Sequence, residues 1–480
     1  MIVRQPRLYY SGQDVSPHDV AQVSAQLVNL IVRHGAENRR IGLRLENSTF
    51  FVTAILTTIE LEYSAVLLNP AFRPVELERA MSLAQVTLLL LPEETNVGDT
   101  LPTLRPRRLG AVETRWGGKL ALWRVGEGAQ PQPAADLGQE REFVVQFTSG
   151  VSGAPLAVCR TYAQADNELA AFISRARLTS DDVVLCAVPL FHSYGFFPGL
   201  MASLRVGAKF VVLPKFSPSE LALLIDRHRP TILLGVPLMY EVLSLAHGDS
   251  TLDFSSFKYL VSAGGPLAPN VATGFSQRFG RRISQLYGST ETGVISFDDG
   301  QDKSLPSDSV GQPLAGRRVR IVDEQGDDVA SGGDGEIILK SPATANTYLG
   351  RAEVAAEKIR DGWFFTSDIG HFDRQGRLHI TGRKSAFINV GGLKVDPAEV
   401  EQAIQSSGEV IECAVIGVPR PQFGEAIHAY LVLKPGGSVD RIRAHCRGRI
   451  SSFKMPREFC SVDRLPRSAT GKVLRKDLLP

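Results

Sequence analysis

The sequence predicts an α/β fold with a large N-terminal domain of parallel α/β layers, which includes a small β-barrel-like part, followed by a small α+β C-terminal domain. Strand-like apolar runs alternate with helical segments through most of the chain, which is typical of a parallel sheet covered by helices. Short alternating runs between Asp/Gly turns occupy Ser309–Arg383, and a compact tail follows. We therefore expect domains at residues 1–382, β-rich from about 309 to 382, and at residues 383–480.

Length and charge limit the classes of protein to consider. A chain of 480 residues is too long for a single core. Lys and Arg number 53 and Asp and Glu 51, a net charge of +2, and no basic run is long enough to indicate a nucleic-acid partner. The N-terminus lacks the apolar stretch of a signal peptide, and the longest apolar run, Phe50–Ile59, is followed by Glu60. We expect no membrane partner and a ligand that binds in a pocket.

The cysteines indicate the redox compartment. They number five, are widely spaced and include no C-x-x-C pair. This pattern predicts neither a disulfide framework nor a zinc site. We interpret the cysteines as reduced, mostly core thiols, and we expect a cytoplasmic protein.

The first helix has both a start signal and a stop signal. Ser16 can cap it, Pro17 suits its first position, and Gly35 can end it. Apolar residues recur at helical spacing between these signals. The next expected elements are strand Ile41–Leu45, helix Phe51–Leu61, strand Ala65–Leu68, helix Pro74–Met81 and strand Val86–Leu91.

A connection interrupts this alternation. Between Thr100 and Gln139 the chain is rich in Pro, Gly and Arg, and we expect a surface connection there. The alternation resumes with strands at Val183–Val188, Lys209–Leu213, Ile232–Gly235, Tyr259–Ser262 and Ile283–Leu286, and helices at Ser217–His228 and Pro237–Ala246. We expect one large domain of two similar halves, without a visible internal sequence repeat.

The tail has an alternation of its own, which predicts a compact βαβ-like domain of ordinary size. Its expected elements are helix Pro397–Ser406, strands Glu412–Gly417 and Ala426–Leu433, helix Val439–Arg449 and strand Phe459–Val462.

A loop of glycines and hydroxyls follows the apolar run Phe143–Phe147, which we interpret as a buried strand. Such a loop can aim backbone N–H groups and hydroxyls at one phosphate. The segment lacks the Gly-Lys-Ser/Thr of a Walker A motif, so an ordinary turn is the alternative for this loop taken alone. The residues that would contact phosphate are Thr148, Ser149, Gly150, Ser152 and Gly153.

Further motifs follow in fixed order. They are Tyr287-Gly288-Ser289-Thr290-Glu291-Thr292-Gly293, Gly362-Trp363-Phe364-Phe365-Thr366-Ser367-Asp368, Gly382-Arg383-Lys384 and Pro466-Arg467-Ser468-Ala469-Thr470-Gly471-Lys472. With the loop at Thr148, this series resembles the adenylate-forming superfamily of acyl- and aryl-CoA synthetases, peptide-synthetase adenylation domains and luciferases, and its pattern is closest to the stand-alone acyl- or aryl-acid ligases. The resemblance covers nearly the whole chain. It implies an ATP-dependent, AMP-forming acid–thiol ligase that uses Mg²⁺.

The resemblance implies a role for each motif in nucleotide binding. Glu291 would bind Mg²⁺, and the Thr290 hydroxyl would meet the α-phosphate. Asp368 would hold both ribose hydroxyls, together with Arg383. The adenine would stack on Tyr287, and the remaining nucleotide-binding positions would be Gly288, Ser289, Gly264, Gly265 and Pro266.

The C-terminal domain would carry the catalytic lysine and would be mobile. Lys472 lies in a Pro/Gly-flanked loop and would offset negative charge between the carboxylate and the α-phosphate when the domains close. The hinge position is Ser385, and a loop with Gly391 and Gly392 would serve the second step. The acceptor thiol would belong to coenzyme A or to the phosphopantetheine of an acyl or peptidyl carrier protein.

The segment at His192 matches the place where acyl- and aryl-CoA synthetases put an aromatic residue or a histidine beside the acyl group. A core histidine is the alternative. Amino-acid-activating relatives carry a nearby Asp for the substrate ammonium, and none is present here, so a plain carboxylic acid, aryl or medium aliphatic, is the better substrate. The expected acyl pocket consists of His192, Ser193, Val236, Met239, Tyr240, Ala263 and Ile295.

Some positions depart from the family pattern. Lysines usually occupy the positions of Ala154 and Leu156, and a glycine that of Ala157. Loss of those cations predicts weaker binding of the β- and γ-phosphates and a reduced affinity for ATP. Ser385 stands where relatives have an Asp or Lys, and Ser367 replaces the usual Gly before the ribose-binding acid.

Two other functions stay open at this level. The adenylate could be used for amide formation or other non-thioester chemistry, or the chain could bind a nucleotide or acyl ligand with degenerate catalysis. The retention of Lys472 argues against a mere binding protein. No G-x-S-x-G, H-E-x-x-H or complete G-x-G-x-x-G unit is present, so hydrolase, metalloprotease and dehydrogenase functions have no support.

Overall fold

Contacts within the chain divide it into two units. The computed structural model describes residues 3–4, 7–35, 38–125, 140–148, 155–245, 252–300, 309–383, 387–420, 424–466, 473 and 475–478. The first unit consists of Met1–Pro70, Met81–Phe147 and Ala157–Lys384. The second consists of Ala71–Ala80, Thr148–Leu156 and Ser385–Pro480.

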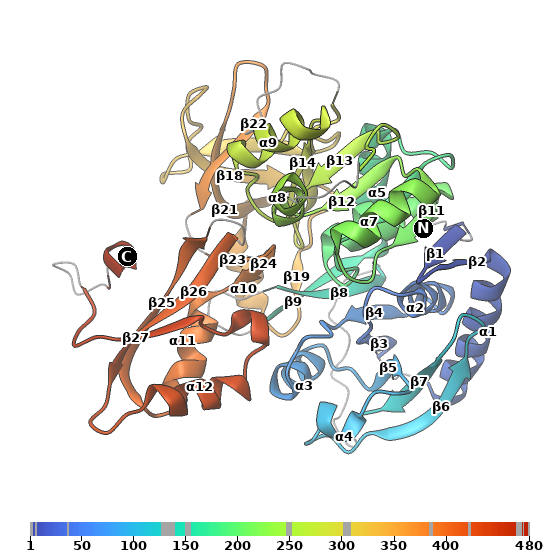
Figure 1. Cartoon of the computed structure of the whole chain (residues 1–480), viewed down its shortest axis with the longest axis horizontal. Coiled ribbons are helices and arrows are strands. Elements are labelled where there is room, and N and C mark those ends of the chain that lie inside the picture. Colours follow the sequence, from blue (N-terminus) through green and yellow to red (C-terminus); the bar gives the residue numbers. More distant parts are fainter. Residues whose placement is uncertain are drawn as a thin grey trace. The chain divides into compact units, whose positions relative to one another are not determined.

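A nine-stranded sheet forms one half of the large unit, in the order β16-β15-β14-β13-β12-β10-β11-β1-β2 (Figure 1). The neighbours from β14 to β1 pair in parallel, as the alternation predicts. Its strands are β1 Arg7–Tyr10, β2 Gln13–Val15, β10 Val183–Cys186, β11 Lys209–Val212, β12 Ile232–Gly235, β13 Tyr259–Ser262, β14 Ser284–Ser289, β15 Gly293–Phe297 and β16 Gln312–Pro313.

An eight-stranded sheet forms the other half, in the order β19-β9-β8-β4-β3-β5-β7-β6. The expected structureless connection after Thr100 is wrong in part, because β6 and β7 form an antiparallel pair at the sheet edge. The strands are β3 Arg40–Leu43, β4 Ser64–Leu67, β5 Leu88–Pro92, β6 Arg107–Glu113, β7 Lys119–Arg124, β8 Glu142–Thr148, β9 Leu156–Thr161 and β19 Thr347–Tyr348.

The helices begin where the sequence supplies caps. The Ser16 hydroxyl accepts the Asp19 N–H at the start of α1, and Gly35, with φ 61°, ends that helix. The helices before the tail are α1 Pro17–His34, α2 Thr49–Glu60, α3 Pro74–Leu83, α4 Val97–Thr100, α5 Tyr162–Ala176, η1 Gly195–Met201, α6 Ala202–Val206, α7 Pro218–His228, α8 Pro237–Leu245, α9 Pro269–Phe279 and α10 Ala352–Lys358.

The central strands are buried on both faces. In β10, Val184 and Cys186 pack into one core, while Leu185, between them, packs into a second core with residues of α7 and α9. Successive side chains of a strand point to opposite faces, so these strands must be apolar at every position. This is why they are visible in the sequence as continuous apolar runs.

One buried ion pair ties strands of the eight-stranded sheet together. The Arg40 guanidinium donates to both carboxylate oxygens of Glu142, at 2.8 and 2.7 Å, and to the carbonyl of Ala84 at 3.1 Å. The side chains are 3% and 12% exposed. Hydrogen bonds from Arg40 lower the pKa of Glu142 against the opposing effect of burial.

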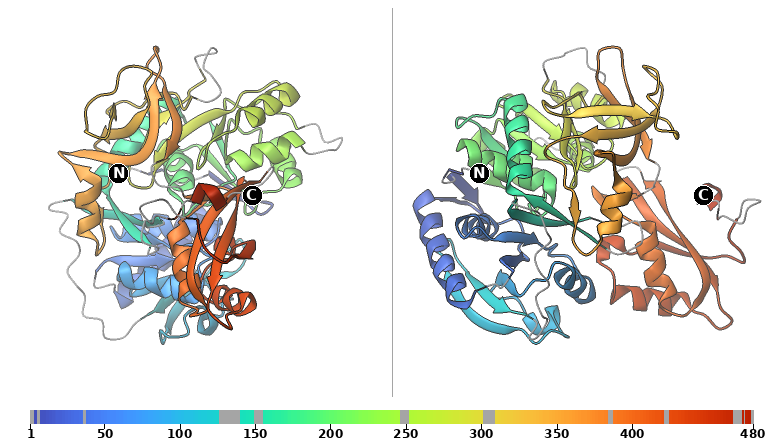
Figure 2. Two further views of the ribbon diagram at one scale, coloured as in Figure 1. Left: turned by 90° about the vertical axis from the view of Figure 1, so that its left-hand side faces the viewer. Right: turned by 180° about the vertical axis from the view of Figure 1, so that it is seen from behind.

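A five-stranded sheet forms the β-rich part, in the order β17-β18-β21-β20, with β22 paired to β21 (Figure 2). The long β21–β22 hairpin sets Asp368 opposite Arg383. The strands are β17 Arg318–Val322, β18 Gly335–Lys340, β20 Ile359–Arg360, β21 Trp363–Phe372 and β22 Leu378–Arg383.

The tail has a sheet of its own, in the order β24-β23-β26-β25, with β27 paired in parallel to β26. Helices α11 and α12 share one apolar cluster with these strands (Figure 1). The elements are β23 Ile388–Val390, β24 Leu393–Val395, α11 Pro397–Gln405, β25 Val410–Arg420, β26 Gly424–Leu433, α12 Val439–Arg447, η2 Ser452–Lys454, β27 Glu458–Ser461 and η3 Arg475–Leu478. The expected α+β character is confirmed, although β25 and β26 form one antiparallel hairpin.

All five cysteines are free thiols, four of them buried, and burial raises the pKa of the Cys186 thiol to about 12. Within the described ranges, no helix is both long and apolar enough to cross a membrane.

Candidate functional site

The predicted phosphate loop begins at the end of β8. Thr148 is the last residue of that strand, and its Oγ1 is buried without a hydrogen-bond partner among the described residues. A buried, unpartnered hydroxyl is costly unless a ligand satisfies it. Ser149, Gly150, Ser152, Gly153 and Ala154 lie outside the described residues.

The second motif forms a β-hairpin. The expected strand end at Leu286 is wrong: β14 continues through Tyr287 and Gly288 to Ser289, and β15 returns antiparallel from Gly293. The tight pairing explains the glycine at 288, because a Cβ there would collide with the carbonyl oxygen of Gly293.

The turn of this hairpin presents Thr290 and Glu291. Ser289 and Thr292 close it: the Ser289 N–H donates to Thr292 Oγ1 at 3.0 Å, and the Thr292 N–H to Ser289 Oγ at 3.2 Å. Thr290 and Glu291 are partly exposed at its tip. The turn therefore holds one hydroxyl and one carboxylate side by side in reach of solvent.

Glu291 is held through both its backbone and its side chain. The Ala345 N–H donates to the Glu291 carbonyl at 2.6 Å, and the Tyr348 hydroxyl reaches Glu291 Oε1 at 3.4 Å. Burial, and then the neighbouring Glu291 carboxylate, raise the pKa of Tyr348, which keeps its phenol protonated as a donor. The sequence analysis missed Tyr348, which no motif contains.

Asp368 lies between two partners. The Tyr287 hydroxyl donates to Asp368 Oδ2 at 2.7 Å, and Arg383 Nε lies 3.3 Å from Oδ1. Burial, followed by the Asp368 charge, raises the pKa of Tyr287 well above its usual value. Ser367, just before Asp368, has φ 64°, a conformation that favours glycine. The structure thus brings together three residues that the sequence analysis assigned to the nucleoside.

The Asp368–Arg383 pairing depends on the turn that closes the same hairpin. The Asp373 carboxylate accepts the Gln375 and Arg377 N–H groups, both at 2.9 Å, and Arg377 Nε at 2.5 Å. Burial alone would raise the pKa of Asp373, but these hydrogen bonds outweigh it and lower the pKa to about 2.

We expect the Asp373 carboxylate to make a contribution to stability that is lost in acid. The folded-state pKa of Asp373 lies below the unfolded value, so its stabilisation is fully present above pH 4 and is lost as the pH falls toward 2. A shift of this size corresponds to about 2–3 kcal/mol. We expect the free energy of unfolding of the wild type to fall by about 2 kcal/mol more than that of Asp373→Asn between pH 5 and 2, by urea denaturation. Parallel pH curves would contradict this prediction.

The predicted acyl segment lies between β10 and the π-helix η1. The His192 ring lies against Phe191, with centroids 4.5 Å apart, and both are partly buried, as is Ser193. Gly195 begins η1, and a Cβ there would lie 2.5 Å from the Pro189 carbonyl oxygen, so only glycine fits this bend. The backbone is therefore constrained at this bend, three residues after His192.

Part of the predicted acyl pocket gathers at this segment. Val236, Met239 and Ala263 pack in the same apolar cluster as Phe191 and Tyr194. The carbonyl of Val261, two residues before Ala263, accepts the Tyr194 hydroxyl at 2.9 Å. These three residues therefore share one apolar cluster with Phe191, whose ring contacts His192.

Two other predicted pocket residues are buried. Tyr240 is fully buried in the second core, where its hydroxyl donates to the Val261 carbonyl at 2.8 Å. Ile295 packs in a separate cluster with Leu339 and Phe364. Tyr240 lies on α8 and Ile295 on β15, and the burial of both side chains was not visible in the sequence.

The predicted glycine turns take different forms in the two units: a turn after a strand in the first and a two-residue hairpin in the second. Gly264, with φ 86°, follows β13 and starts the turn to Gly265 and Pro266. In the tail, Gly391 and Gly392, with φ 59° and 90°, form the two-residue hairpin between β23 and β24. Ser385 and Lys472 lie outside the described residues.

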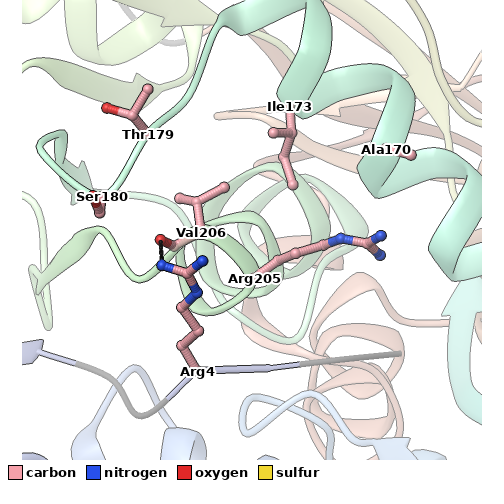
Figure 3. A pocket seen from close by; sticks show the side chains of 7 residues that line it. All are labelled: Arg4, Ala170, Ile173, Thr179, Ser180, Arg205 and Val206. Atoms are coloured by element: carbon pink, nitrogen blue, oxygen red, sulfur yellow. Dashed lines mark hydrogen bonds between the residues drawn. The ribbon is translucent and has the colours of Figure 1, made fainter.

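A cavity of about 470 Å³ lies away from all of these residues. Figure 3 shows Arg4 bonded to the Val206 carbonyl, at 3.3 Å, with the Arg205 guanidinium directed to another side, where it pairs with Asp166. None of the sequence-predicted site residues lines this cavity. In the described part of the chain, no group of three or more His, Cys, Asp or Glu side chains is arranged to hold a metal ion by itself.

Comparison with known proteins gives two family matches. The AMP-binding enzyme family matches residues 4–349, and the AMP-binding enzyme C-terminal domain matches residues 399–472. The chain is 34% identical over 346 residues to a long-chain-fatty-acid–CoA ligase of Bacillus subtilis, covering 70% of this chain and 61% of that ligase. It is 31% identical over 380 residues to a feruloyl-CoA synthase of an Amycolatopsis species, covering 78% and 77%.

Solved structures give the same assignment. A double mutant of o-succinylbenzoate CoA synthetase from Bacillus subtilis matches with a TM-score of 0.86 at 25% identity, covering 99% of this chain and 95% of that one. An amide bond synthetase from Marinactinospora thermotolerans shares the fold, with a TM-score of 0.86 at 24% identity, over 99% and 97% of the two chains. The expected α/β fold and the resemblance to adenylate-forming enzymes are thereby confirmed, and the chain belongs to the AMP-binding enzyme family.

Proposed function

We propose that this protein activates a carboxylic acid with MgATP and transfers the acyl group to a thiol. In the first step a carboxylate oxygen attacks the α-phosphorus of ATP, and the bond to pyrophosphate breaks, giving acyl-AMP. In the second step the sulfur of the acceptor attacks the acyl carbon, the thiol proton is lost and AMP leaves. The relatives with CoA-ligase names support this reaction class.

One observation carries the proposal: the β14–β15 hairpin connects the residues that we propose to bind the two ends of the nucleotide. Tyr287 on β14 donates to Asp368, and Glu291 lies at the turn of the same hairpin. The same rigid hairpin would thus fix the position of a ribose bound at Asp368 and of phosphates bound at Glu291. Fixing both ends of a nucleotide in this way lowers the entropic cost of aligning its α-phosphate.

The residues at the turn fit a magnesium ion bound together with ATP. Glu291 offers one partly exposed carboxylate. Mg²⁺ is usually held by only one or two carboxylates plus substrate phosphates, so a single acid suffices. When bound, the ion would neutralise charge on the departing pyrophosphate.

The proposed catalytic groups would act on the phosphates of ATP and on the charge that develops during attack. Thr290 would donate its hydroxyl to an α-phosphate oxygen, and Lys472 would bring a point cation to the developing charge. Thr148, whose hydroxyl has no partner among the residues that the structure describes, would donate to the phosphates. Because the usual loop cations are replaced by Ala154 and Leu156, we propose a KM for ATP higher than that of relatives with both lysines.

The acyl side favours an uncharged organic tail. Val236, Met239 and Ala263 share an apolar cluster with Phe191, and we propose that they line the acyl site together with His192 and Ser193. The segment Phe191–Gly195 contains no Asp or Glu to pair with an ammonium group. An unpaired ammonium would be expensive to bury there. We propose an aryl or medium aliphatic acid as substrate.

The second step would use the tail. We propose residues 383–480 as the mobile C-terminal domain, Ser385 as its hinge, and the Gly391-Gly392 turn as the element that approaches the acceptor. The acceptor is coenzyme A or a carrier-protein phosphopantetheine. We propose a cytoplasmic location, because the free thiols match a reducing compartment.

ATP–pyrophosphate exchange with benzoic, cinnamic, short-, medium- and long-chain acids tests the first step. Exchange with one acid class is expected, followed by thioester formation on addition of CoA or a phosphopantetheinylated carrier protein. An amide product with an amine acceptor, but no thioester, would instead support an amide synthetase. No exchange with any acid, despite ATP binding, would support a binding protein.

A further inference from the structure

A buried ion pair outside all the motifs lies next to the Glu291 turn. Arg160 on β9 pairs with Glu168 on α5, and their side chains are 1% and 2% exposed. The Arg160 guanidinium also lies 4.4 Å from the centre of the Phe197 ring. Burying two charges costs about as much as their attraction returns, so stability alone is a weak reason for such a pair.

Glu168 supports the strand that leaves the turn. Its Oε1 accepts the Val294 N–H at 3.2 Å. Gly293 lies so close that a Cβ there would be 2.5 Å from Glu168 Oε2. From another direction, Arg317 Nε donates to the Val294 carbonyl at 3.2 Å. The position of the hairpin directly after Glu291 is therefore set by the Glu168 carboxylate.

Arg160 supports a second segment, around Ala343 and Ala345, which bonds to the backbone of Glu291. Its Nη2 donates to the Ala343 carbonyl at 2.9 Å. Two residues later the Ala345 N–H donates to the Glu291 carbonyl at 2.6 Å. Ala343 and Ala345 are fully buried. One ion pair thus connects the two backbone segments that meet at Glu291.

We propose that Arg160 and Glu168 are positioning residues that fix the Glu291 carboxylate for MgATP. This inference rests on the proposed function, which makes Glu291 the metal ligand. Removal of a group that orients a metal ligand typically costs 10- to 100-fold in metal affinity. A positioning role therefore predicts a loss of MgATP affinity that is separate from any loss of stability.

The test compares Glu168→Gln with Glu142→Gln, which weakens the similarly buried pair with Arg40. We expect Glu168→Gln to raise the MgATP Kd, by calorimetric titration, and the Mg²⁺ concentration for half-maximal exchange by about 10-fold or more. The KM for the acid should stay within about two-fold, because the acid does not contact the metal ligand. Glu142→Gln should lower the thermal midpoint without changing either Mg²⁺-dependent value by more than about two-fold.

Two further variants keep the inference falsifiable. Arg160→Lys keeps a cation and should fold even where Glu168→Gln does not, yet it loses the planar fork that reaches Ala343. The double variant Arg160→Met/Glu168→Gln removes both charges and should regain thermal stability while its MgATP Kd stays raised. If the Kd recovers together with the thermal midpoint, the pair is only structural and the inference is wrong.

The outcomes separate this inference from the proposed function. A wild type that adenylates an acid, with variants that bind MgATP normally, overturns the positioning role and leaves the function standing. A wild type that neither binds MgATP nor exchanges pyrophosphate overturns both.

Discussion

Replacing Lys472 by alanine is expected to reduce ATP–pyrophosphate exchange by about 10²–10³-fold. The reason is electrostatic: loss of one preorganised group at the developing charge costs about that much in similar sites. The KM for ATP should change little, because the adenine, ribose and metal partners are elsewhere. Thioester formation from chemically made acyl-AMP should continue at close to the wild-type rate, because the proposed second step does not use this lysine.

Lys434→Ala is the matched control for that variant. Lys434 is an exposed lysine of the same unit, at the end of β26. We expect it to leave both half-reactions unchanged. An equal loss in both half-reactions of Lys472→Ala would instead indicate damage to the tail as a whole and would contradict the assigned role.

Asp368→Asn is expected to weaken ATP binding by roughly 30- to 1000-fold. The substitution replaces a carboxylate that would accept two ribose hydroxyls by a neutral amide with one acceptor oxygen. Charge-assisted hydrogen bonds are worth about 1.5–3 kcal/mol each and neutral ones about 0.5–1.5, so the expected loss is about 2–4 kcal/mol. It also weakens the contacts with Tyr287 and Arg383, at 2.7 and 3.3 Å. The measurement is the Kd for ATP, together with the ratio of Kd values for 2′-deoxyATP and ATP.

The ratio of the Kd values for 2′-deoxyATP and ATP tests whether Asp368 contacts the ribose 2′-hydroxyl. The wild type should discriminate strongly against 2′-deoxyATP. The Asn variant should discriminate less, because Asn offers one uncharged acceptor oxygen where the carboxylate offers two charged ones. Asp334→Asn is the control: this carboxylate adjoins the same sheet and pairs with His371 Nδ1 at 2.9 Å. If Asp368→Asn keeps the full discrimination, the ribose is bound elsewhere.

The parallel strands were predictable from sequence because each is apolar on both faces. The edge pair β6–β7 was not, because Arg107, Arg108 and Gly110 interrupt the period of the half-exposed strand β6. The π-helix η1 was hidden by Pro198 within it, a residue that ordinarily argues against a helix. Both elements were missed for one reason. The local sequence pattern reports only the intrinsic propensity of a segment, and contacts with neighbouring elements can override that propensity.

The motifs led to the residues that converge at Asp368 and at the Glu291 turn. They did not lead to Tyr348, or to the Arg160–Glu168 pair, whose partners belong to a strand and the following helix. Charged residues at such spacing are common on surfaces, and only the fold reveals that these two are buried. Tyr240 stays a predicted pocket residue, and its complete burial was not visible in the sequence.

Leu156 occupies one of the two positions of the phosphate loop where the family pattern has a lysine. It is only 5% exposed at the first position of β9, with its neighbours Ala157 and Val158 fully buried. A lysine placed there would have to lead its ammonium out of an apolar setting or lose its charge. Leu156→Lys by itself is therefore not expected to add a cation to the phosphate loop.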